Sequence, residues 1–192
     1  YRYVEPTSVT PFSAGARKKG LAGIFFAYLM HSSPSDSPSS FTSDELNSFL
    51  GIARLASSGE MDKALSRIQN DLFDLGADLA NPITKSPKFP PLRVTEKQVK
   101  RLESTIDKFN KPLSSLNSFI LPGGSISASY LHNARTVARR AESLIVELNA
   151  KEKINVFSMT YVNRLSDLFF VLSRVENGNG KKDVLWKPGQ NT

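Results

Sequence analysis

The chain has 192 residues, 40% of them hydrophobic, and this length and composition predict one globular domain with a substantial core. Lysine and arginine number 25 against 18 acidic residues, and the net charge of +7 favours an anionic partner without identifying it. The absence of cysteine excludes disulfides, thiolate catalysis and cysteine-bound metals, and two histidines are too few for a histidine-rich metal site. The most apolar run, residues 21–30, is about half as long as a membrane span.

Residues 1–42 are predicted to be irregular and partly flexible. Residues 32–40 (SSPSDSPSS) form a low-complexity loop rich in serine and proline. The first twenty residues contain four basic residues and only one acid, Glu5, which weakly resembles the remnant of a transit peptide.

Five later segments carry apolar residues at the three- and four-residue spacing of amphipathic helices. They are residues 43–53, 61–79, 95–113, 125–148 and 154–175. Ser43 is the predicted N-cap of the first helix, with Asp44 and Glu45 in its first turn. No segment shows the period-two alternation of a strand. We predict an all-α fold, a five-helix antiparallel bundle over residues 43–177 with a C-terminal tail over 178–192.

Local signals mark several ends of these helices. Thr95 and Gln98 have the spacing of a capping box, and Gly123 and Gly124 form a turn before the fourth helix. Residues 177–180 (NGNG) are expected to stop the fifth helix.

The fourth predicted helix carries a concentration of charged side chains on one face. They lie at spacings of three, four and three: His132, Arg135, Arg139 and Glu142. With Arg140 added, three arginines lie within six residues. Clustered arginines are costly to bury and are usually found where an anion is held.

The fifth predicted helix adds further polar groups, since Asn163, Asp167 and Arg174 lie roughly on one face. For any single pair, a structural salt bridge or a solvated surface is the more common explanation. For the whole set that explanation is weaker, because the arginines outnumber the nearby carboxylates. Phe119 and His132, taken alone, are each expected more often in a core than in a site.

Several separate motifs of this chain occur in order and with suitable spacing in one known family. They are residues 44–51 (DELNSFLG), 68–79 (IQNDLFDLGADL), 119–124 (FILPGG), 132–142 (HNARTVARRAE), 163–167 (NRLSD) and 184–188 (VLWKP). Together they resemble the PduO-type ATP:cob(I)alamin adenosyltransferases, over about residues 43–189.

The resemblance implies a five-helix bundle that assembles as a homotrimer with active sites between subunits. It implies transfer of the 5′-deoxyadenosyl group of ATP, accompanied by Mg²⁺, to the cobalt of cob(I)alamin. The products are adenosylcobalamin and triphosphate. Hand-off to an adenosylcobalamin-dependent enzyme, and a soluble intracellular location in the mitochondrial matrix or the bacterial cytoplasm, are further expectations.

The resemblance also implies roles for individual residues. Contacts to ATP fall to Arg139, Arg140, Glu142 and Asn163, and Arg139 would stabilise the triphosphate leaving group. Arg135 would pair with Asp44 across the subunit interface and position the site.

On the cobalamin side the implied residues are Phe119, His132 and Asp167. Phe119 would press on the lower face of the corrin, exclude the axial base and leave cobalt four-coordinate, which eases reduction to the Co(I) nucleophile. Because the substrate supplies the nucleophile, the protein needs no catalytic Cys, Ser or His, and no resident metal site is predicted.

The chain departs from the family at its N-terminus. Members begin with a segment like Thr-Lys-Thr-Gly-Asp-x-Gly-x-Thr, which wraps the ATP phosphates, whereas this chain has residues 15–23 (GARKKGLAG) followed by the serine- and proline-rich loop. Ser143 also stands where an arginine is common.

Two alternatives remain open from the sequence. The first is a catalytically weak or inactive family member that binds or carries cobalamin, because the phosphate-binding motif is missing. The second and weaker is a basic bundle that binds RNA or DNA. It has little support, because the sequence lacks interleaved aromatic and basic residues. We expect neither a nucleic-acid partner nor a membrane partner.

Overall fold

The chain divides into two compact units, residues 1–35 and 36–192. The computed structural model describes residues 38–81, 83 and 90–190, all of which belong to the second unit. The predictions made for residues 1–37, including the segment 15–23 that replaces the family's phosphate-binding motif, lie outside the described residues.

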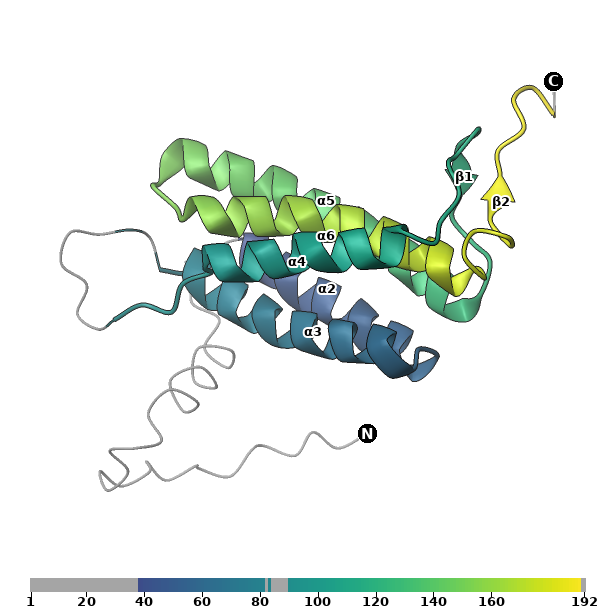
Figure 1. The fold of residues 1–192 in the computed structure, drawn as a ribbon. Helices are drawn as coiled ribbons and strands as arrows, with labels where there is room; N and C mark the ends of the chain where they lie inside the picture. The colour runs from purple at the N-terminus through teal and green to yellow at the C-terminus, as the bar shows by residue number, and fades with distance from the viewer. Residues whose placement is uncertain (1–37, 82, 84–89, 191–192) are drawn as a thin grey trace, which may run out of the picture. The chain divides into compact units, whose positions relative to one another are not determined.

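Five helices make up most of the described chain, as predicted (Figure 1). They are α2 (Pro38–Leu55), α3 (Gly59–Leu79), α4 (Glu96–Asn110), α5 (Ile126–Lys151) and α6 (Val156–Glu176). The α5 helix packs between α2 and α6, while α3 covers α2 and α4 covers α6. Within the described residues, none of these helices combines the length and apolar character needed to cross a membrane.

The first helix begins earlier than predicted. It starts at Pro38, so the prediction of Ser43 as an N-cap is wrong. Ser43 is buried inside the helix, and its hydroxyl donates a hydrogen bond of 3.0 Å to the carbonyl of Leu72. Asp44 therefore lies beyond the first turn. Proline is favoured at the first helical position because the N–H it lacks would have no partner there.

The other helix ends follow the sequence signals. The Thr95 N–H donates to the Gln98 side chain at 2.8 Å, as in a capping box. Ser125 caps α5 by accepting a hydrogen bond from the N–H of Ala128 at 3.1 Å. Asn177 ends α6, and the positive φ angles of the next three residues stop the helix from continuing.

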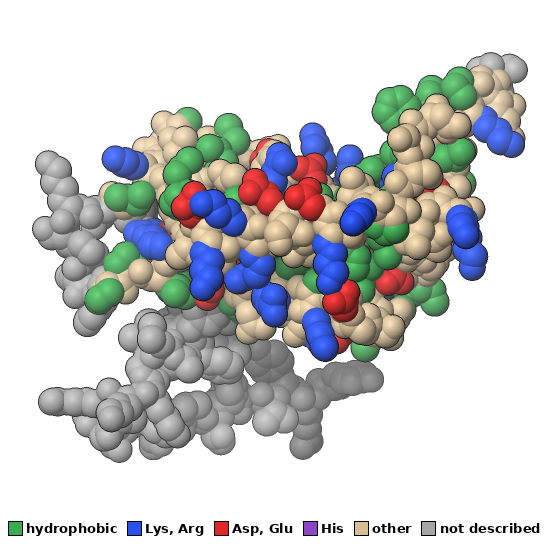
Figure 2. Space-filling model, viewed as in Figure 1, with side chains coloured by type: hydrophobic (Ala, Val, Ile, Leu, Met, Phe, Trp, Pro, Cys, Tyr) green, Lys and Arg blue, Asp and Glu red, His purple; other side chains and the backbone are tan. Residues whose placement is uncertain are grey.

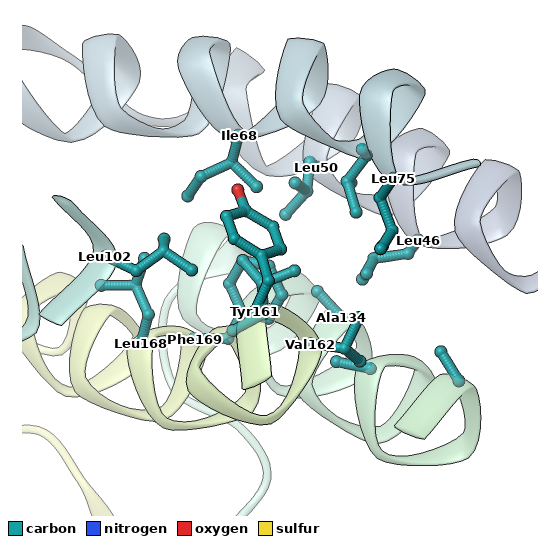
Figure 3. Close-up of a cluster of buried hydrophobic side chains, with 14 of the residues drawn as sticks. Leu46, Leu50, Ile68, Leu75, Leu102, Ala134, Tyr161, Val162, Leu168 and Phe169 are labelled. Carbon is teal, nitrogen blue, oxygen red and sulfur yellow. The ribbon is translucent and has the colours of Figure 1, made fainter. Parts of the chain in front are cut away.

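The core runs along the axis of the bundle and draws on all five helices (Figure 3). Tyr161 and Phe169 are its largest fully buried side chains, and Leu50, Leu72 and Leu131 from other helices belong to the same buried cluster. Burial of such side chains contributes about 1.5–3 kcal/mol each to folding, so this core supplies most of the stability of the bundle.

Two buried carboxylates on α3, those of Asp71 and Asp78, join it to α4 and α6. Asp71 accepts hydrogen bonds from the Tyr161 hydroxyl at 2.9 Å and from the Gln98 amide at 3.1 Å, and it also pairs with Arg101. Burial raises the pKa of Tyr161 well above 10, so the phenol stays protonated and donates.

Asp78 makes a second set of such contacts near the end of α3. It pairs with Arg93 at 2.5 Å and accepts from the Val94 N–H at 2.8 Å and the Ser158 hydroxyl at 2.7 Å. Because each oxygen has partners, these buried charges fix the register of α3 against α4 and α6.

Two short strands, absent from the prediction, lie at one end of the bundle (Figure 1). β1 (Ile120–Leu121) pairs antiparallel with β2 (Val184–Leu185). Each strand has two residues, too few for a period-two pattern to be visible in sequence. The pairing fastens the C-terminal tail to the segment between α4 and α5.

Candidate active site

On the arginine-bearing face of α5, exposure rises from His132 to Arg139. His132 is buried, with 4% of its surface exposed, Arg135 is half-buried, and Arg139 is exposed. The Arg135 guanidinium lies 5.6 Å from the ring centroid of Phe170 on α6, a cation–π contact. Among the described residues, no acidic side chain forms an ion pair with Arg135 or Arg139. Positive charge on this face is therefore available to an anion.

Arg140 is held differently from its neighbour Arg139. It forms an ion pair with Glu45 of α2, and each of the two side chains is about half exposed. An exposed pair of this kind contributes at most about 1 kcal/mol, so an anion of higher charge can displace Glu45 from Arg140.

Glu142 and Asn163 are brought together from neighbouring helices. The Asn163 Nδ2 donates to Glu142 Oε1 at 2.7 Å, and Asn163 Oδ1 accepts from Arg164. Arg164 also forms an ion pair with Asp167 at 3.2 Å. The result is a half-exposed chain of polar groups running from α5 onto α6.

Asp44 lies on the surface of α2. Neighbouring groups shield its carboxyl group partly from water, and this raises its pKa. Within the described part of one chain, Asp44 and Arg135 do not pair with each other. Their predicted pairing across a subunit interface stays a prediction.

Phe119 lies away from the arginine face, in the segment that leads into β1. Its side chain is 76% exposed, and its ring meets the edge of Trp186 with centroids 5.8 Å apart. Hydrophobic side chains gather around the β1–β2 end in Figure 2, whereas basic and acidic side chains alternate over the visible face of the bundle. This end offers the apolar surface that a large flat ligand would need.

His132 lies beneath the surface rather than on it. Its Nε2 has no hydrogen-bond partner among the described residues. Burial lowers the pKa of His132, and the nearby charge of Arg135 lowers it further, while Asp183 opposes this. The imidazole is therefore neutral near pH 7, and its predicted contact with cobalamin stays a prediction.

Arg174 does not join Asn163 and Asp167 in an exposed polar group on α6. Its side chain is buried and pairs with Asp183 of the tail at 3.0 Å. Sequence reasoning gave Trp186 no role beyond its place in the tail motif at 184–188, and gave Asn177 none beyond ending the fifth helix. Their further contacts depend on the tail folding back onto the bundle.

A resident metal site was not predicted, and the described residues contain no group of three or more His, Asp or Glu side chains that could hold an ion.

Comparison with known proteins identifies relatives of the chain. The family model for cobalamin adenosyltransferases matches residues 41–176. The corrinoid adenosyltransferase of Mycobacterium tuberculosis strain H37Rv is 49% identical over 150 residues, covering 76% of this chain and 77% of the relative. That of Bacillus subtilis strain 168 is 45% identical over 149 residues, covering 74% and 75%.

Solved structures agree with the sequence matches. A phenylalanine-to-histidine variant of a PduO-type ATP:corrinoid adenosyltransferase from Lactobacillus reuteri, complexed with cobalamin and ATP, has a TM-score of 0.69 at 37% identity. The match covers 78% of this chain and 82% of that one. An arginine-to-lysine variant complexed with ATP has a TM-score of 0.68 at 37% identity, covering 80% and 87%. The chain therefore belongs to the cobalamin adenosyltransferase family.

Proposed function

We propose that this protein transfers the 5′-deoxyadenosyl group of ATP to cob(I)alamin. The observation that carries the proposal is the exposed face of α5, where Arg139 has no ion-pair partner among the described residues. Glu142 follows Arg139 by three residues, and its carboxylate accepts a hydrogen bond from Asn163. An anion-holding arginine beside a hydrogen-bonded acid and amide suits a nucleotide with its phosphates.

In the proposed reaction the electron pair of cobalt in cob(I)alamin attacks C5′ of ATP. The Co–C bond forms as the C5′–O bond breaks, and the leaving electron pair goes to the triphosphate oxygen. Cobalt is thereby oxidised from Co(I) to Co(III), and an external reductant supplies the Co(I) state beforehand. Arg139 and Arg140 hold the charge that develops on the triphosphate, which stabilises the transition state.

The remaining residues position the two substrates. Glu142 and Asn163 orient the nucleoside end of ATP, and Phe119 meets the lower face of the corrin and keeps the axial base away. His132 and Asp167 line the cobalamin side, and Mg²⁺ accompanies the phosphates.

We further propose a homotrimer with active sites between subunits, in which Arg135 of one subunit pairs with Asp44 of another. Within the described part of one chain neither Arg135 nor Asp44 has an ion-pair partner, so both are available to pair across an interface. The product would pass to an adenosylcobalamin-dependent enzyme in the mitochondrial matrix or the bacterial cytoplasm.

A second candidate is a family member that binds cobalamin and transfers no adenosyl group. It is favoured by the absence of a Gly-Asp-x-Gly-x-Thr motif from the sequence. Losing several phosphate contacts at about 0.5–1.5 kcal/mol each would weaken ATP binding by orders of magnitude.

An anaerobic absorbance assay with ATP, Mg²⁺ and chemically reduced cob(I)alamin separates the two candidates. Growth of the adenosylcobalamin spectrum with turnover supports the transferase. A folded protein that binds cobalamin in titration but neither binds ATP nor turns over supports the carrier.

A further inference from the structure

Two side chains at the C-terminal end of α6, Arg174 and Asn177, hold the segment that carries Phe119. Asn177 has no exposed surface, and both polar atoms of its side chain make hydrogen bonds. Its Nδ2 donates to the Gly123 carbonyl at 3.1 Å and to Asp183 Oδ1 at 3.1 Å, and its Oδ1 accepts from the Ser125 N–H at 2.9 Å. One amide thus joins the end of α6, the start of α5 and the tail.

Arg174 makes the matching contacts from one turn earlier. Its side chain is 7% exposed, its Nε donates to Asp183 Oδ2 at 3.0 Å, and one Nη donates to the Ser114 carbonyl at 2.9 Å. Both oxygens of Asp183 are therefore held by α6, and the residues before Phe119 are tied to the same helix. We call Arg174 and Asn177 together the α6 clamp.

The backbone around the clamp is shaped to fit these two side chains. Gly124 has φ +106°, and a Cβ placed there would lie 2.1 Å from the Asn177 Oδ1. Gly180 has φ +84°, and its Cβ would lie 2.9 Å from an Nη of Arg174. A side chain at Gly124 is thus excluded twice, by backbone conformation and by the position of Asn177.

Phe119 has little packing of its own to hold it, because its side chain is 76% exposed. Its place depends on the tail strand. The Trp186 N–H donates to the Phe119 carbonyl at 2.8 Å, and the Ser118 hydroxyl donates to the Trp186 carbonyl at 2.8 Å. Since Asp183 lies three residues before Trp186, the clamp fixes this ladder, and the ladder fixes Phe119.

We propose that Arg174 and Asn177 are positioning residues for the cobalamin half of the reaction. They act through Asp183 and the β1–β2 ladder to hold the Phe119 ring where it meets the corrin. This inference rests on the proposed function for the identity of the ligand. The clamp itself can be tested without any ligand.

The test uses the full chain and three substitutions, Arg174→Met, Asn177→Ala and Asp183→Ala. Asp183 lies outside the helices, but its substitution leaves the buried Arg174 without its ion-pair partner, so circular dichroism and thermal melts of each variant check that the helices remain folded. Amide hydrogen exchange at Trp186 is measured first, and quenching of the fluorescence of Trp186, the single tryptophan of the chain, gives a second reading. We expect exchange at Trp186 to become at least about tenfold faster in each variant, because each loses buried hydrogen bonds that hold the tail.

Arg93→Met is the matched control, since it breaks another ion pair to a buried aspartate, Asp78, at the opposite end of the bundle (Figure 1). It should leave the exchange rate at Trp186 unchanged. Unchanged exchange in all three clamp variants would overturn the clamp.

The second readout is the kinetics of adenosylation. The clamp variants should lower kcat/KM for cobalamin by about tenfold or more and leave the KM for ATP within about twofold, while Arg93→Met changes neither. Faster exchange with unaltered kinetics would overturn the positioning role. If the unsubstituted protein showed no turnover, the proposed function would fail, and the exchange rates alone would decide whether the clamp holds the Phe119 segment.

Discussion

The Asn163 amide donates a hydrogen bond of 2.7 Å to the Glu142 carboxylate and thereby joins α6 to α5 next to the exposed arginine face. Because Asn163 Oδ1 accepts from Arg164, the amide is oriented with its NH₂ group toward Glu142. A fixed donor and a fixed acceptor at this place would present a defined polar edge to a nucleoside.

Asn163→Ala is therefore expected to raise the KM for ATP by about two- to twelvefold, the effect of one lost hydrogen bond of about 0.5–1.5 kcal/mol. The KM for cobalamin should stay the same. Steady-state kinetics with each substrate varied in turn give both values. Asn70→Ala, which removes an exposed amide on α3, is the control, and equal effects of the two substitutions would contradict the role of Asn163.

Arg139→Ala should lower kcat by at least about a hundredfold, because the variant lacks the positive charge that stabilises the leaving triphosphate. Its melting temperature should remain close to that of the unsubstituted protein, since the side chain is exposed and forms no ion pair among the described residues. Single-turnover rates and thermal melts measure the two effects. Arg67→Ala, an exposed arginine on α3, makes the same change in net charge, and a similar loss of kcat in that variant would contradict a specific role for Arg139.

Glu45→Gln tests whether Glu45 competes with ATP for Arg140. With the ion pair removed, the KM for ATP should fall by about two- to fivefold, which corresponds to about 0.5–1 kcal/mol for an exposed pair. A rise in this KM would show instead that Glu45 holds Arg140 in its binding position. The prediction is strongest at low salt, where surface charges are least screened.

His132 should make the stability of the protein depend on pH. Burial and Arg135 lower its pKa below 6.5 in the folded state, so the unfolded chain binds a proton more readily. The stabilisation is present above pH 6.5 and is lost as the pH falls from there through the folded-state pKa. Denaturant unfolding at a series of pH values should show that the free energy of unfolding falls more steeply with decreasing pH for the unsubstituted protein than for His132→Leu. The variant His31→Gln, which removes the other histidine, should keep the steep loss, and a flat profile there would assign the effect to His31.

The helices were predictable from sequence because their apolar spacing reflects burial directly, as at Leu65, Leu72 and Leu131. The start of α2 was not, because the serine- and proline-rich composition of residues 32–40 suggested a loop, and proline favours the first turn of a helix as well as a loop. Ser43 matched a cap by residue type, but its hydroxyl bonds across to α3. Such long-range contacts leave no local pattern.

The site, like the fold, has residues that the sequence predicts and residues that only the structure brings together. The shared face of Arg135 and Arg139 follows from helical geometry alone, so the sequence was enough to find it. The partners of Arg174 and Asn177 depend on how the tail returns to the bundle, and no periodicity encodes that return. In the sequence Asp183 and Gly124 look like ordinary turn residues, and only the structure shows that both lie against Asn177.

The most direct test of the proposed function is the product balance of a single anaerobic turnover. Protein, ATP, Mg²⁺ and cob(I)alamin are mixed, quenched, and analysed by chromatography for corrinoids and for phosphates. The transfer mechanism predicts adenosylcobalamin and triphosphate in equal amounts, and neither product with Arg139→Ala over the same time. Cobalamin that stays unalkylated at saturating ATP, or ATP cleaved to ADP and phosphate without a Co–C bond, would contradict it.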